Sequence, residues 1–353
     1  MNVGILTRWN ATCGVSLHAE LLAEEFFKMG HDVRIFAPHT SSANRWWHHR
    51  IIRDDEDFVI RCYNELSPGT MSGGALNFEG VLSEDLDLLI VESYTSIPYS
   101  DVERLVRRMD AVTIAVIHEG SRRDIRYSDM GVFDAIVAFD QRYVREILYD
   151  CVERVRIIPY PCHPVRESGR RFAEDRLTFF SFGRQPYAEY ADFISALEKL
   201  SRKYDFVYRV VRSDGLLPFR REWFKQEQKR LRDTGEVYRY LHSSDIHLLP
   251  KGNTRNVVVS STFYQCLGSL VPMVVPETRH FELLPEEKPA AVYRNVDDLV
   301  KKLEMLIEDD GFRNRIVEAA RKFVEEFRSD RIAGKFIDLY KSLDRTRAAL
   351  NVC

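Results

Sequence analysis

The chain has 353 residues, a net charge of −3, 45% hydrophobic residues and 30% charged residues. This length exceeds what one ordinary hydrophobic core organises, so two domains are expected. The composition is typical of globular proteins, and the balanced charge argues against a nucleic-acid partner. No apolar run approaches the length of a membrane span, so we expect a cytoplasmic protein with at most peripheral membrane contact.

The six cysteines are scattered along the chain, without a Cys-x-x-Cys pair. Neither they nor the histidine pairs at 48–49 and at 242 and 247 have metal-ligand spacing. We therefore expect reduced, mostly buried thiols and no metal site.

The first 38 residues predict a strand, a loop, a helix and a second strand. A short apolar run at 3–6 predicts a buried strand, and apolar residues spaced by three or four from Val15 to Met29 predict a helix. Gly30 ends this helix before a strand at 33–36. A crossover between parallel strands places the loop at the carboxyl end of the first strand, where open α/β sheets bind ligands.

Further strands and helices alternate in the rest of the first half, which predicts a parallel sheet covered on both faces. Strands are expected at 86–91, 112–117, 134–139 and 155–158. His118 follows the second of these strands. A histidine at this edge can exchange a proton with a ligand or polarise a hydroxyl, or it can be satisfied by loop backbone, and spacing alone leaves both open.

The stretch 39–79 lacks this periodicity and is expected to be irregular, with a mobile glycine- and serine-rich loop at 68–74. Within it, residues 46–53 mix aromatic and basic side chains. Such a patch could hold a sugar, a lipid interface or a partner. We favour the alternative that the tryptophans pack into the core.

The second half repeats the α/β alternation after a charged linker at 167–176. Strands are expected at 177–182, 206–211, 246–249, 271–275 and 290–293, a helix or loop at 218–231, and three closing helices at 296–307, 312–327 and 330–343. Arg184, Lys251 and the start of a helix at Ser261 fall at strand ends or helix starts. Two cations and helix-start amides on one sheet edge suit a diphosphate, although either cation alone could be a solvated side chain.

Several segments, taken in order, resemble those of retaining GT-B glycosyltransferases. These belong to the large family 4 type, with glycogen synthase-like, sucrose synthase-like and mannosyltransferase-like members. The segments are CGV at 13–15 with GHDV at 30–33, VIHEG at 116–120, FGRQP at 182–186, YRYLHSSDIHLLP at 238–250 and STFYQCLGSLVPMVV at 261–275.

This resemblance implies an α/β fold of the GT-B type, in which two Rossmann-like domains face each other across a cleft. The acceptor-side domain would span 1–165, the donor-side domain 166–329, and a last helix at 330–353 would cross back to the first domain. A sugar would pass from a nucleotide-diphosphate sugar to a glycan, lipid or small-metabolite acceptor, with retention of anomeric configuration. No cofactor or metal would be required. The sugar, the base and the oligomeric state stay open.

The resemblance also implies roles for single residues. His118 would contact the transferred sugar, and Arg184 would bind the donor phosphate and stabilise the leaving group. The further donor-side candidates are Gly14, Lys251, Arg255, Ser261, Thr262 and Gln265. The acceptor-side candidates are Asn10, Thr12 and His18.

The donor motif departs from the family pattern. Glu189 stands near the place where a lysine usually follows the arginine. Val257 and Gln265 replace two glutamates, and Leu270 replaces a glycine. Lys251 or Arg255 would then have to supply the missing charge.

Three kinds of function therefore stay open. The chain is an active transferase, a weak or inactive relative that acts as a binding subunit, or another enzyme on the same architecture, such as a nucleotide-sugar epimerase. A nicotinamide-dependent oxidoreductase is disfavoured, because the opening loop lacks G-x-G-x-x-G and Pro38, not an acidic residue, ends the second strand.

Overall fold

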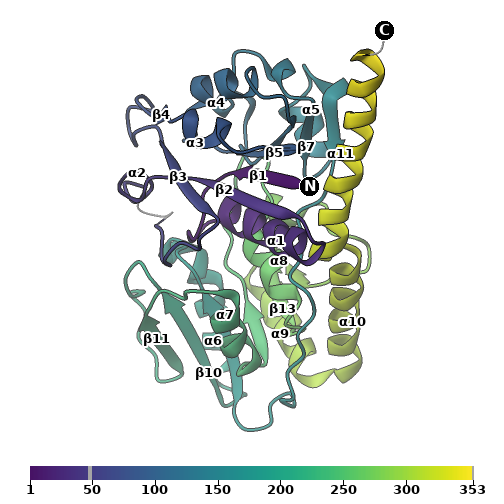
Figure 1. The fold of residues 1–353 in the computed structure, drawn as a ribbon. Helices are drawn as coiled ribbons and strands as arrows, with labels where there is room; N and C mark the ends of the chain where they lie inside the picture. The colour runs from purple at the N-terminus through teal and green to yellow at the C-terminus, as the bar shows by residue number, and fades with distance from the viewer. Residues whose placement is uncertain (47–49, 352–353) are drawn as a thin grey trace. The chain divides into compact units, whose positions relative to one another are not determined.

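The computed structural model describes residues 1–46 and 50–351 (Figure 1), and the chain divides into two compact units. Unit 1 comprises Met1–Pro161, Asn256–Ser261 and Ser329–Cys353. Unit 2 comprises Cys162–Arg255 and Thr262–Arg328. None of the described helices is long and apolar enough to cross a bilayer.

Unit 1 is built on an eight-stranded sheet in the order β4-β3-β2-β1-β5-β6-β7-β8, parallel except for the pair β3 and β4. Its strands are β1 (Asn2–Leu6), β2 (Asp32–Pro38), β3 (Val59–Asn64), β4 (Ala75–Leu76), β5 (Leu88–Ser93), β6 (Val112–Ile117), β7 (Ala135–Ala138) and β8 (Val155–Ile157). Its helices are α1 (Gly14–Lys28), α2 (Thr40–Ala43), α3 (Glu79–Leu82), α4 (Tyr99–Val106), α5 (Gln141–Glu146) and α11 (Ser329–Asn351). Short 3₁₀ helices span Arg122–Asp124, Met130–Val132 and Val152–Arg154.

The central strands of unit 1 are apolar because both faces of the sheet are covered. Every residue of β5, β6 and β7 is buried, which is the burial expected of parallel strands between helical layers. The last helix, α11, packs against α1 and β6 of the same unit, as Figure 1 shows along one side of the sheet. Helix α11 therefore belongs to the fold of the first half of the chain.

Unit 2 has a six-stranded parallel sheet in the order β11-β10-β9-β12-β13-β14. Its strands are β9 (Leu177–Phe182), β10 (Phe206–Arg212), β11 (Phe224–Gln228), β12 (Ile246–Leu248), β13 (Met273–Pro276) and β14 (Ala291–Tyr293). Its helices are α6 (Ala191–Leu200), α7 (Thr234–His242), α8 (Ser261–Leu267), α9 (Val296–Glu308) and α10 (Asp310–Glu326). The first residue of α8, Ser261, is assigned to unit 1, and the rest of the helix belongs to unit 2. The 3₁₀ helices are Tyr187–Tyr190 and Arg279–Phe281.

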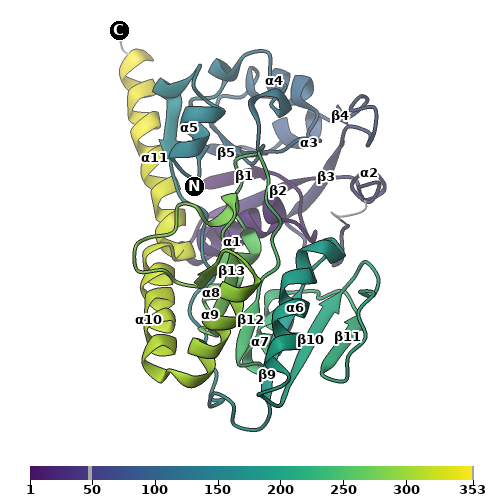
Figure 2. The same ribbon diagram turned by 180° about the vertical axis from the view of Figure 1, so that it is seen from behind.

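The core of unit 2 lies on both faces of its sheet. Successive residues of β9 point to opposite faces, so Phe179 joins one apolar cluster and Phe180 joins the other. Helices α6 and α9 contribute to the first cluster and lie side by side (Figure 2), while α7 and α8 contribute to the second. Each fully buried aromatic side chain of this kind contributes about 1.5–3 kcal/mol to stability.

Two expectations for the secondary structure are wrong. The stretch 39–79 is not wholly irregular, because it contains β3 and β4, and the basic stretch 218–231, expected to be a helix or loop, contains the strand β11. Charged residues within these strands, such as Arg61 and Lys225, hide their apolar pattern. β11 is an edge strand, and partly solvated strands near an edge tolerate such residues.

The aromatic and basic patch at 46–53 is described only in part. Trp46 is half-buried, and its Nε1 donates a hydrogen bond to the backbone oxygen of Leu66 at 3.2 Å. The guanidinium of Arg8 lies 5.9 Å from the Trp46 ring centroid. Trp47, His48 and His49 lie outside the described residues.

Two glycines, one in a crowded place of unit 2 and one in an open place of α11, give a matched test of how tightly the chain is packed around them. A Cβ atom on Gly268 would lie 2.6 Å from the backbone oxygens of His163 and Pro164. A Cβ atom on Gly334, inside α11, would meet nothing within 4 Å. We expect Gly268→Ala to lower the free energy of unfolding by about 1–3 kcal/mol and Gly334→Ala to raise it by about 0.5–1 kcal/mol. Urea denaturation measures both, and a shift of the same sign in the two variants would contradict the packing.

Candidate functional site

Three side chains meet at the carboxyl end of the unit 1 sheet. Glu92 lies at the end of β5, and His118 directly follows β6, its parallel neighbour. His18 lies in the second turn of α1, which follows the loop after β1. The sheet order places β1, β5 and β6 next to one another, so residues far apart in sequence come together at one edge.

The carboxylate of Glu92 bridges the two imidazole rings. His18 Nδ1 lies 2.7 Å from Glu92 Oε1, and His118 Nε2 lies 2.5 Å from Glu92 Oε2. The side chains of His18 and Glu92 are 0% exposed, and that of His118 is 9% exposed. Burial alone would raise the pKa of Glu92, but the two histidines beside it lower this pKa to about 2. Glu92 is therefore a carboxylate at neutral pH.

Aromatic rings surround His18 and hold it in place. The ring of His18 lies 5.2 to 5.4 Å from the rings of His118, Phe139 and Tyr160 and 6.2 Å from the ring of Phe336 in α11. These contacts fix the orientation in which His18 meets the carboxylate. The bridge is thus part of a packed core and not of a solvated surface.

Among the residues that the structure describes, His18, Glu92 and His118 are also the one group of histidine, cysteine and acidic side chains close enough together to be considered for a metal ion, with their nitrogen and oxygen atoms within 4.8 Å of one another. Two ligands of a tetrahedral zinc ion lie about 3.3 Å apart, because each bond is about 2.0–2.1 Å long. The nitrogen–oxygen distances of 2.5 and 2.7 Å are hydrogen bonds instead. An ion would fit only if the carboxylate gave up both bonds.

The residue after His118 is a second buried acid. Glu119 Oε1 accepts hydrogen bonds from the hydroxyls of Ser93 at 2.6 Å and Tyr99 at 2.7 Å. Burial raises the pKa of Glu119. The backbone N–H of Val257 then donates to the Gly120 oxygen at 2.9 Å, so the segment 256–261 packs on the loop that carries His118.

The acceptor-side candidates in the opening loop bind the chain's own backbone. Asn10 is buried, has φ +56°, and donates from Nδ2 to the oxygen of Asp54 at 2.9 Å. The backbone N–H of Thr12 donates to the oxygen of Arg50 at 3.2 Å. These bonds tie the loop after β1 to the segment at 50–55.

Gly14 is small for a reason that the sequence did not reveal. A Cβ atom there would lie 3.0 Å from the Cβ and Oγ atoms of Ser261, and Tyr160 Oη donates to the Gly14 oxygen at 2.7 Å. The first residue of α1 is therefore packed so closely against Ser261 that a side chain at position 14 would crowd it. Ser261 groups with unit 1 and its neighbour Thr262 with unit 2.

The carboxyl end of the unit 2 sheet carries two of the predicted cations. Arg184 follows β9, and Lys251 follows β12, the strand beside it. Gly183 has φ +130°, a conformation that favours glycine, so the chain can turn at this point. Burial lowers the pKa of Lys251, the charge of Glu189 raises it, and the charge of Arg184 lowers it. The three charges therefore lie close enough to influence one another.

The remaining donor-side candidates in unit 2 do not lie directly after a strand of the sheet. Gln265 is buried, and its Nε2 donates to Thr234 Oγ1 at 3.1 Å, so its amide is engaged inside unit 2. Arg255 is exposed at the end of the segment after β12. Glu189, at the place of the family's lysine, lies against Gly252, beside Lys251.

Part of the chain matches a known protein family, and the matched part includes both cations at the edge of the unit 2 sheet. Residues 184–338 match a protein family described as glycosyl transferase-like. This range begins at Arg184 and includes Lys251.

The whole chain is similar to several solved structures. The pneumococcal O-GlcNAc transferase GtfA has 10% identity and a TM-score of 0.67 over 97% of this chain and 99% of its own. An α-glucosyltransferase named AGT has 13% identity and a TM-score of 0.67 over 97% and 100%. The Anabaena protein HepE has 12% identity and a TM-score of 0.66 over 97% and 100%. This chain has the GT-B fold. The fold predicted from the motif order, two Rossmann-like α/β domains, is confirmed.

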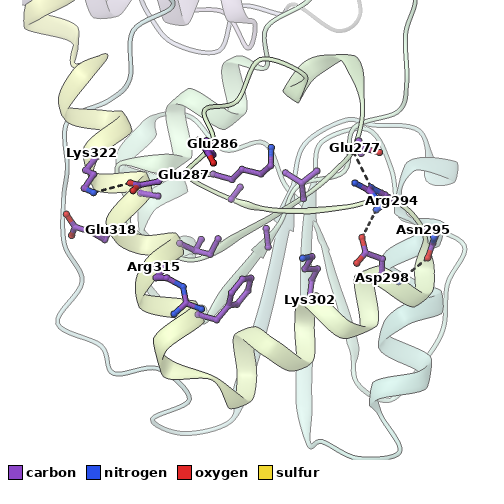
Figure 3. Close-up of a pocket in the computed structure, with 17 residues that line it drawn as sticks. Glu277, Glu286, Glu287, Arg294, Asn295, Asp298, Lys302, Arg315, Glu318 and Lys322 are labelled. Carbon is purple, nitrogen blue, oxygen red and sulfur yellow. Dashed lines mark hydrogen bonds and ion pairs between the residues drawn. The ribbon is translucent and has the colours of Figure 1, made fainter.

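This GT-B chain also has a groove in unit 2, 770 Å³ in volume, between β14, α9 and α10 (Figure 3). Much of its charge is paired, since Arg294 lies 3.4 Å from Glu277 and Lys322 lies 3.0 Å from Glu287. None of the predicted site residues lines it.

The sheet of unit 2 also buries His247, for which the sequence predicted no role once its spacing from His242 had ruled out a metal site. His247 of β12 stacks on Phe182 at 5.8 Å, and neither ring nitrogen has a hydrogen-bond partner among the described residues. Burial lowers the pKa of His247 to about 3. His247 is therefore a neutral core residue.

The depressed pKa of His247 predicts a pH-dependent stability. The folded state keeps His247 neutral down to about pH 3, whereas the unfolded chain binds a proton below 6.5. Stability from this group is present above pH 6.5 and falls with pH below it, by about 2 kcal/mol at pH 5. In urea denaturation at pH 7.5 and pH 5, His247→Leu should lose less stability than the wild type. An equal loss in both proteins would contradict the assignment.

Proposed function

We propose that this chain is a glycosyltransferase that moves a sugar from a nucleotide-diphosphate sugar to an acceptor. The observation that carries the proposal is the position of Arg184 and Lys251 after neighbouring strands of one sheet edge, inside the range that matches a glycosyl transferase-like family. That match favours transfer over the alternative of an epimerase.

The similar structures support the donor class. GtfA was solved with UDP and GlcNAc, AGT with UDP, and HepE with UDP-glucose. By analogy, a uridine diphosphate sugar is the first donor to test. Unit 2 would hold its diphosphate, since an arginine and a lysine suit phosphate oxygens in complementary ways.

The chemistry of transfer needs charge stabilisation more than covalent help. As the bond to the sugar breaks, negative charge develops on the leaving diphosphate. Arg184, with its fork of N–H donors, and Lys251, as a compact charge, would stabilise this charge. Retention of anomeric configuration and independence of metals or other cofactors are parts of the proposal that rest on the motif resemblance.

His118 would act on the transferred sugar from unit 1. Unit 1 would bind the acceptor, for which a glycan, a lipid and a small metabolite are the candidates. One similar α-glucosyltransferase was solved with UDP and a 13-mer DNA, a class of ligand that the balanced charge of this chain argues against.

A second candidate is a weak or inactive relative that binds a nucleotide sugar without transferring it. Two observations favour it. Glu189 brings a negative charge beside Lys251, and the Gln265 amide is engaged by Thr234. Nucleotide binding without turnover on any donor and acceptor would support this second candidate.

Removing either cation should weaken nucleotide binding. A charge-assisted hydrogen bond contributes about 1.5–3 kcal/mol, so Arg184→Ala and Lys251→Ala should each raise the Kd of a nucleoside diphosphate about 10- to 100-fold. Calorimetry with a panel of nucleoside diphosphates measures this. Arg209→Ala, an exposed arginine inside β10, is the matched control and should bind as the wild type does. No binding of any panel member to the wild type would sink the proposal.

The role of His118 is separable from nucleotide binding. We expect His118→Ala to abolish sugar transfer, because the group that contacts the sugar is lost, while the Kd of the nucleoside diphosphate stays unchanged. Product detection by mass spectrometry and calorimetry on the same preparation test this pair of outcomes. Parallel loss of transfer and nucleotide binding would contradict the assigned role.

A further inference from the structure

We infer that Glu92 is a positioning residue that determines which nitrogen of the His118 ring carries the proton, and therefore whether the nitrogen that faces a ligand accepts or donates a hydrogen bond. The inference rests on the bridged geometry of His18, Glu92 and His118 in unit 1. Its consequence for catalysis rests in addition on the proposed function, in which His118 meets the transferred sugar.

The charge of Glu92 fixes the protons on both rings. An ionised carboxylate has only acceptor lone pairs, so each ring nitrogen that faces it must carry a hydrogen. His118 therefore donates from Nε2, and His18 donates from Nδ1. When the His118 ring is neutral, only one of its nitrogens carries a proton, so its Nδ1 atom then holds a lone pair.

That Nδ1 atom is the one left for a ligand. It makes no hydrogen bond within the described part of the chain, and the His118 side chain is 9% exposed at the end of β6. Neutral His118 thus presents a hydrogen-bond acceptor, and the group that meets it must be a donor. A sugar hydroxyl has this chemistry, whereas a carbonyl or phosphate oxygen does not.

His18 is the anchor that makes the arrangement specific. It occupies the second oxygen of Glu92, so the buried carboxylate is satisfied on both sides and cannot turn away from His118. The other ring nitrogen of His18, Nε2, is buried without a hydrogen-bond partner among the described residues. A lone pair is tolerated at that place, but an N–H there would lose its hydrogen bond to water.

This asymmetry predicts what an amide would do in place of the carboxylate. In Glu92→Gln the oxygen would face His18, because the opposite orientation would force a proton onto the buried Nε2 of His18. The amide NH₂ would then face His118 Nε2, which must become an acceptor. The proton of His118 would move to Nδ1, so the ligand would meet a donor instead of an acceptor.

The direct test is nuclear magnetic resonance of protein labelled with ¹⁵N in its histidine rings, with His118 assigned from the spectrum of His118→Gln. We expect the Nε2–H tautomer of His118 in the wild type and in Glu92→Asp, and the Nδ1–H tautomer in Glu92→Gln. Glu103→Gln, which alters another buried glutamate of unit 1 that accepts from Ser128, is the control and should leave His118 unchanged. An Nδ1–H tautomer in the wild type, or an unchanged tautomer in Glu92→Gln, would overturn the inference.

Kinetics give a second readout that a merely structural role would not reproduce. With an active donor and acceptor, Glu92→Gln should lower kcat about 10²-fold or more, as a wrong histidine tautomer does elsewhere. The Kd of the nucleoside diphosphate should stay unchanged, and Glu92→Asp should recover part of kcat. An unaltered kcat despite the changed tautomer would overturn the catalytic part. If no donor is turned over, the proposed function fails, while the tautomer measurement still decides the positioning role.

Discussion

The carboxylate of Glu92 carries a negative charge inside unit 1 and is held there by one hydrogen bond to each oxygen. Removing such a charge from water costs several kcal/mol unless its lone pairs are satisfied. His18 from α1 and His118 after β6 satisfy them. The bridge therefore couples the first helix to two central strands, and it determines how His118 is presented at the edge of the sheet.

Unit 2 carries two cations, Arg184 and Lys251, at the carboxyl edge of its own sheet. Parallel strands end side by side, so Arg184 after β9 and Lys251 after β12 are brought close without any proximity in sequence. Their charges influence each other, and Glu189 partly offsets the repulsion. In the function that we propose, unit 1 supplies an oriented hydrogen-bond acceptor and unit 2 supplies the charge that a leaving diphosphate needs.

The apolar strands and the order of motifs sufficed to predict the fold, because β5, β6 and β9 are buried runs whose composition follows from being covered on both faces. β11 was missed because its charged residues are tolerated only at a sheet edge, which is a property of the tertiary structure. Leu270 has φ +57° at the place where the family carries glycine. Leu270 therefore adopts a left-handed conformation that glycine would adopt more easily, which costs about 1–2 kcal/mol of folding free energy. The sequence shows no sign of this turn, because the glycine that usually marks it is absent.

The candidate site was predictable only in part. His118, Arg184 and Lys251 follow predicted strands, so their place at an edge could be inferred from the sequence. Glu92 also directly follows a predicted strand, but nothing in the sequence pairs it with His18, 74 residues away, and with His118, 26 residues away. Only the strand order shows that these residues meet, and only the burial of Glu92 shows that it carries a charge that must be satisfied.

The central claim is that nucleotide and sugar are bound by different units, and hydrogen–deuterium exchange tests it most directly. Nucleoside diphosphate alone should slow amide exchange at 182–189 and 249–253 of unit 2. The matching nucleotide sugar should add protection at 116–121, around His118 of unit 1. Protection by nucleotide that is confined to unit 1, or a sugar that adds no protection around His118, would contradict the account.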